Sequence, residues 1–98
     1  MISERLIEKI KEALEVYNRY HAPEAIAELL EVKDCIIKVV FTGSFCLTCG
    51  VRDWIEDLLY VFKDAGIDVA LEKVLEPADD SLNIRIGVFR IKACKDDR

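Results

Sequence analysis

Residues 35–50 read CIIKVVFTGSFCLTCG, and this stretch decides the fold. Its first half, 35–42, is rich in β-branched residues and almost continuously apolar, which predicts a central strand. Gly43 begins the break after that strand. From about 48 to 65, apolar residues recur at three- and four-residue steps, which predicts an amphipathic helix. The stretch therefore predicts a strand that turns sharply into a helix.

Cys46 and Cys49 form a C-x-x-C motif at this turn. The unpaired N–H groups and the dipole of a first helical turn favour negative charge, so they lower the pKa of nearby thiols. Thiolates attack disulfides and bind metals, and this spacing lets both sulfurs face one point. The motif indicates a dithiol or half of a metal site. The alternatives are two small buried cysteines or a structural Cys46–Cys49 disulfide.

The rest of the chain predicts one more helix and further strands. Apolar residues at helical steps predict a helix over 3–20, and β-rich segments predict strands over 67–76 and 82–93. In 82–93 the apolar residues change parity after Val88, which a β-bulge would explain. Residues 23–32 favour a helix by local propensity but also fit an edge strand by alternation.

Together these elements predict an α/β fold of the α+β kind. We expect a two-layer sandwich in which two helices pack on one face of a three- to four-stranded mixed sheet, in the order α-β-β-α-β-β. The length of 98 residues predicts a single domain over 1–98.

Composition excludes several classes of protein. The chain is 52% apolar and 34% charged, which is too hydrophobic for disorder. Its net charge of −5 argues against nucleic acid or an anionic membrane as a partner. Met1 leads directly into a charged helical pattern, so we expect a cytoplasmic protein without a membrane span. The chain lacks Gln and is rich in Glu, Lys, Ile and Val, which is typical of thermophiles.

The remaining possible ligands are poorly placed to complete a metal site within one chain. Seven strand residues at about 3.3 Å each would separate Cys35 from the motif by roughly 20 Å. If the last strand runs antiparallel to 35–42, Cys94 lies near Cys35. A Cys35–Cys94 disulfide is then one expectation, and two unrelated thiols are the other. His21, the sole histidine, is expected to be an exposed loop residue rather than a ligand or an acid/base group.

This shortage of ligands favours pairing across a homodimer. Two chains that each provide Cys46 and Cys49 supply four thiolates, which is enough to hold a [4Fe–4S] cluster. A two-fold axis near the motif would achieve this without further residues.

The run over 28–43, followed by C-x-x-C and an amphipathic helix, resembles the C-terminal domain of NifU. It also resembles related members of the iron–sulfur cluster assembly (FSCA) domain superfamily. The resemblance covers roughly 5–76 and implies a helix, a hairpin that ends in Thr-Gly, the C-x-x-C, a helix and a strand. It therefore implies a strand over 25–32. Gly50 stands where the family commonly has proline.

The resemblance also implies a function. Cys46 and Cys49 would ligate a transferable cluster held between two subunits, while Thr42 and Gly43 would shape the corner beside it. Such a protein is a scaffold or carrier rather than an enzyme, and its partners are iron–sulfur client or assembly proteins.

Two other functions fit the same motif. A strand, a C-x-x-C and a helix also open a thioredoxin-like thiol–disulfide oxidoreductase. In that case Cys46 would be the nucleophile and Cys49 the resolving thiol. The third alternative is a small interaction domain with a structural disulfide.

Overall fold

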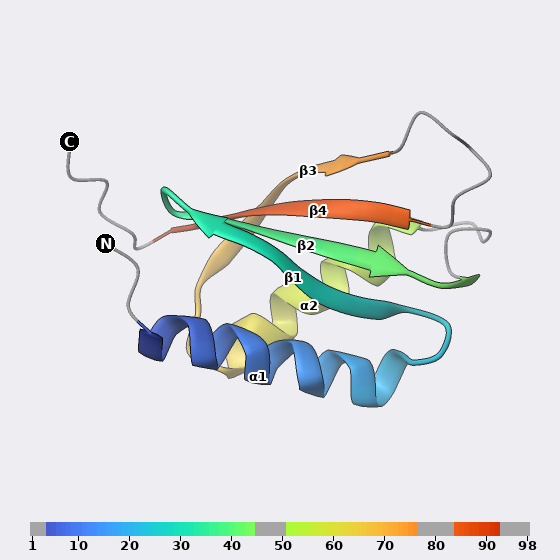
Figure 1. Ribbon diagram of the computed structural model, residues 1–98, viewed down its shortest axis with the longest axis horizontal. Helices are drawn as coiled ribbons and strands as arrows, with labels where there is room; N and C mark the ends of the chain where they lie inside the picture. Colours follow the sequence, from blue (N-terminus) through green and yellow to red (C-terminus); the bar gives the residue numbers. More distant parts are fainter. Residues whose placement is uncertain (1–3, 45–50, 77–83, 93–98) are drawn as a thin grey trace.

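The computed structural model describes residues 4–44, 51–76 and 84–92. In this part of the chain, two helices accompany one four-stranded antiparallel sheet, which makes the fold α+β (Figure 1). The elements follow in the order α1 (Glu4–His21), β1 (Ile26–Lys33), β2 (Ile36–Thr42), α2 (Val51–Asp64), β3 (Val69–Leu75) and β4 (Ile84–Ile91).

The strand order across the sheet is β1-β2-β4-β3, and every neighbouring pair is antiparallel. The prediction of a mixed sheet was therefore wrong. Strand β2 precedes α2 along the chain and β3 follows it, and these two strands run in the same direction. In the sheet, β4 lies between β2 and β3, so they share no hydrogen bonds. A parallel pair would have required β3 to lie directly beside β2.

The ambiguous segment after α1 is a strand. Strand β1 pairs along its length with β2, and the two are joined at Asp34 and Cys35. Both residues have positive φ, at 52° and 67°, as a tight type I′ hairpin requires. Pairing with a neighbouring strand thus outweighs the helix propensity of Ala, Glu and Leu in this segment.

The hydrophobic core lies between the helices and one face of the sheet. On β2, Ile37, Val39 and Phe41 are fully buried, and they share one cluster with Ile10 of α1 and Leu58 of α2. Figure 1 shows both helices on the same side of the sheet. The three alternate positions of β2 thereby define the face that the helices cover.

Strand β4 does not contain the bulge that the sequence predicted within 82–93. It pairs with β2 in unbroken register, from Ile84 opposite Thr42 to Arg90 opposite Ile36. The register shifts among the described strand pairs lie in β1 and β3 instead.

The change of parity in β4 has a different cause. Phe89 lies opposite Ile37 and is buried in the core, so it belongs to the helix-covered face. Ile84, Ile86 and Val88 have the opposite parity and therefore lie on the face away from the helices. The strand carries apolar residues on both faces, and the sequence pattern changes where one series gives way to the other.

Candidate functional site

The candidate site is the corner where β2 passes towards α2. Thr42 ends β2, Ser44 is exposed, and α2 begins at Val51. Cys46 and Cys49 lie between these points, outside the described residues. The described flanks therefore define how the chain enters and leaves the motif.

Gly43 fixes the direction in which the chain leaves β2. Its φ is 131°, a conformation that side-chain-bearing residues rarely adopt. A Cβ atom at this position would lie 2.2 Å from the backbone oxygen of Glu24 and 3.2 Å from that of Pro23. The corner thus packs directly against the turn between α1 and β1, and only glycine leaves room for this contact.

The first two turns of α2 carry more acidic than basic side chains. Arg52 binds Glu56 one turn later, with 2.9 Å between Nε and Oε2. Asp53 lies in the first turn and Asp57 in the second. These carboxylates neutralise part of the positive charge at the N-terminus of α2. The N-terminus therefore attracts a further anion less strongly.

His21 lies at the end of α1 and bridges towards α2. Its Nδ1 is 2.9 Å from the carbonyl oxygen of Tyr17, and its Nε2 is 3.1 Å from Oδ2 of Asp57. Its ring stacks on Tyr17 at 4.0 Å and meets the edge of Trp54 at 5.8 Å. Both ring nitrogens face acceptors, so only the imidazolium form donates both hydrogen bonds.

Tyr17 supports the same junction from inside the core. Its side chain is fully buried, and its hydroxyl donates a 2.7 Å hydrogen bond to the carbonyl oxygen of Trp54. Burial, together with the negative charge of Asp57, raises the pKa of the Tyr17 phenol well above its ordinary value. Tyr17 is therefore a neutral structural donor rather than an acid/base group.

The prediction that His21 is an exposed loop residue was wrong. His21 ends α1 with its side chain only 19% exposed, and it belongs to a cluster with Tyr17, Trp54 and Asp57. Trp54 is partly buried and packs against the core. His21 and Asp57 are 36 residues apart, so no local spacing in the sequence could have indicated their contact.

Cys35 lies at the opposite end of β2 from the corner. It is buried in the hairpin turn, and its carbonyl oxygen accepts a 2.9 Å hydrogen bond from the backbone N–H of Ile91. The sulfur atom of Cys35 is disulfide-bonded. Cys94, the predicted partner, lies outside the described residues. Cys35 is thus occupied in a cross-link, at the end of β2 opposite to Thr42.

Metal ligands do not gather elsewhere in the described segments. Within 4–44, 51–76 and 84–92, no three His, Cys, Asp or Glu side chains are grouped so that they could hold a metal ion. None of the helices described is long and apolar enough to cross a lipid bilayer.

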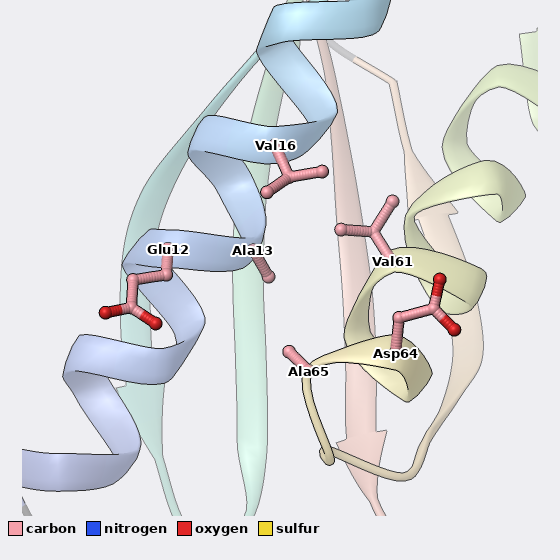
Figure 2. Close-up of a pocket in the computed structure, with 6 residues that line it drawn as sticks. All are labelled: Glu12, Ala13, Val16, Val61, Asp64 and Ala65. Atoms are coloured by element: carbon pink, nitrogen blue, oxygen red, sulfur yellow. The ribbon is translucent and has the colours of Figure 1, made fainter.

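A cavity of about 200 Å³ lies between the helices. Figure 2 shows the carboxylates of Glu12 and Asp64 pointing away from one another, so they do not converge on a ligand. The other lining residues are Ala13, Val16, Val61 and Ala65. None of these four side chains carries a polar group, so the rest of the lining is apolar.

No protein-family model matches the chain, and no curated protein matches it.

Proposed function

We propose that this chain is an iron–sulfur cluster scaffold or carrier of the FSCA type, similar to the NifU C-terminal domain. Cys46 and Cys49 each give a thiolate to a cluster that is completed by the same pair from a second subunit. Soft thiolates suit iron–sulfur clusters, and the described residues supply no third or fourth ligand of this kind.

The observation that carries this proposal is the geometry of Gly43. The glycine ends the hairpin in Thr-Gly, and its close approach to Glu24 holds the direction in which the chain enters the C-x-x-C. A cluster shared between subunits requires such a fixed direction, because both sulfurs must face the same point. Thr42 and Gly43 are therefore assigned to shaping the corner.

The surrounding elements support the same assignment. The segment that follows α1 is the strand β1, as the NifU-like arrangement requires, and the hairpin β1–β2 leads into the corner. We assign the fold to a two-layer sandwich of the order α-β-β-α-β-β.

We also propose that Cys94 is the disulfide partner of Cys35. The N–H of Ile91 already binds the carbonyl oxygen of Cys35, and Cys94 follows three residues later. A disulfide needs Cα atoms within about 7 Å, whereas the length of β2 places the corner roughly 20 Å away. This cross-link is structural and leaves Cys46 and Cys49 available for the cluster.

Anaerobic reconstitution of the full chain with iron and sulfide tests the proposed function. The wild-type protein should acquire a visible thiolate-to-iron absorption band, and Cys46→Ser and Cys49→Ser should lose it. The matched control is the double variant Cys35→Ser/Cys94→Ser, which should keep the band, while peptide mapping without reductant identifies the Cys35 cross-link. Equal reconstitution of Cys46→Ser and wild type would disprove the assignment.

A second assay distinguishes a thioredoxin-like oxidoreductase from a cluster carrier. An oxidoreductase would reduce insulin with dithiothreitol as the electron donor, and Cys46→Ser would abolish that activity. A carrier should show no such activity above the uncatalysed rate.

A further inference from the structure

The face of the sheet opposite the helices, termed here the open face, carries an apolar patch. Ile86 of β4 pairs with Val40 of β2 on one side and with Leu75 of β3 on the other. In the next row, Ile84 pairs with Thr42, which pairs with Ile26 of β1. The open-face patch is defined as Ile26, Val40, Leu75, Ile84 and Ile86.

The patch is accessible and is not part of the core. Leu75 and Ile26 are 38% and 37% exposed, and the other three side chains are partly exposed. An antiparallel sheet with one solvated face normally alternates apolar and polar residues. Here β4 instead presents alternate β-branched residues to the side that carries no helix. A continuous apolar area of this kind indicates an interaction surface.

The charges beside the patch differ between the two edges of the sheet. In the row next to the patch, Glu31 of β1 lies opposite Lys38, then Val88 follows, and Lys73 of β3 ends the row. This row is therefore acidic at its β1 edge and basic at its β3 edge. Such a surface is complementary to a copy of itself that is turned over so that opposite edges meet.

We propose that the open face binds a second copy of this chain, with the two-fold axis parallel to the strands between β2 and β4. This arrangement packs two sheets face to face, about 10 Å apart and aligned within about 30°. It places the β1 edge of one copy against the β3 edge of the other. Glu31 then lies opposite Lys73 of the partner subunit, and this pair occurs twice.

The other simple two-fold arrangement does not bring the corners together. An axis across the strands would place each β1 edge against its own counterpart and would direct the two Thr42 ends of β2 away from one another. The axis parallel to the strands keeps both ends on the same side, so it is preferred.

This inference deepens the proposed function, on which its consequence for the cluster rests. The axis runs beside β2, because neighbouring strands are only about 4.8 Å apart. The Thr42 ends of the two β2 strands therefore lie at the same end of the dimer, on either side of the axis. Each subunit thus delivers its C-x-x-C corner to a common point.

Charge reversal in the full-length apo protein tests the interface without any cluster. Analytical ultracentrifugation should find a wild-type dimer, and Glu31→Lys or Lys73→Glu alone should raise its dissociation constant at least about tenfold. The double variant Glu31→Lys/Lys73→Glu should restore dimerisation. The two residues lie on opposite edges of one sheet, so contact within a subunit cannot account for such a rescue.

Two further variants complete the design. Ile86→Asp, which places a charge in the open-face patch, should give a monomer with an unchanged far-ultraviolet circular dichroism spectrum. Lys63→Glu is the matched control, because it reverses an exposed charge on α2, on the helix-covered side, and should leave the dimer intact.

The possible outcomes separate this interface from the proposed function. A monomeric apo wild type, or a dimer that is insensitive to Ile86→Asp and to both charge reversals, would overturn the interface. If that protein still took up a cluster, the proposed function would stand with a different dimer. Charge rescue in a protein that never binds iron would support the interface and reject the cluster.

Discussion

At the scale of the residue, Gly43 is the position on which the corner depends. Gly43→Ala should lower the free energy of unfolding by about 2–4 kcal/mol, because it adds both backbone strain and a clash with the Glu24 carbonyl. Denaturant titration measures this loss. Gly66→Ala is the matched control: its φ is also positive, at 87°, but the nearest atom to the added Cβ is the mobile Lys9 Nζ at 3.9 Å.

The control should lose only the strain component, about 1 kcal/mol. Equal losses in the two variants would show that the contact between Gly43 and Glu24 does not constrain the corner. Gly43 was recognised from the sequence as the end of the strand. Its partner was not, because Glu24 belongs to a different turn.

Tyr17 gives the protein a distinct response to high pH. Its pKa is raised on folding, so the unfolded chain loses the phenolic proton first as the pH rises. The stabilisation is complete below the unfolded pKa of about 10 and declines above it. Tyr17→Phe should cost about 1 kcal/mol at pH 8 through the lost hydrogen bond to Trp54. Above about pH 10 the difference between wild type and variant should shrink.

Urea midpoints at about pH 8 and pH 10.5 measure this change. Tyr60→Phe is the control, since Tyr60 is 70% exposed and lies on the surface of α2. A stability difference between wild type and Tyr17→Phe that stayed constant with pH would contradict the role of burial.

At the scale of the element, the sequence predicted both helices and the β2 strand because their patterns are local. The 36–42 strand is β-branched, and each helix has an apolar stripe. Strand β1 remained ambiguous because its residues favour a helix, and only its partner strand decides otherwise. The bulge predicted in 82–93 was wrong for a related reason. A parity change in one strand does not reveal whether a second face is also apolar.

The candidate site divides in the same way. The C-x-x-C and the glycine before it lie within residues 43–49, so sequence patterns were sufficient to select them. The contacts of His21 with Trp54 and Asp57 depend on how α1 lies beside α2, and no spacing within the chain encodes that distance. Cys35 lies near the end of β4 because β2 and β4 pair antiparallel. The residues around Cys35 do not encode that pairing, so the sequence could give this position only as a condition.

At the scale of the whole molecule, the protein has one covered and one open sheet face. The covered face and the two helices form the core, while the open-face patch and the C-x-x-C corner lie at the same end of β2. A dimer through the open face would join these two features. The cluster and the interface would then stabilise one another, because anything that binds only the dimer shifts association towards it.

Native mass spectrometry with metal analysis, on protein purified without exposure to air, tests whether two chains share one cluster. We expect a dimer that carries one [4Fe–4S] cluster per two chains, with equal amounts of iron and sulfide. A protein that contained zinc, or no metal after iron and sulfide were supplied, would contradict it.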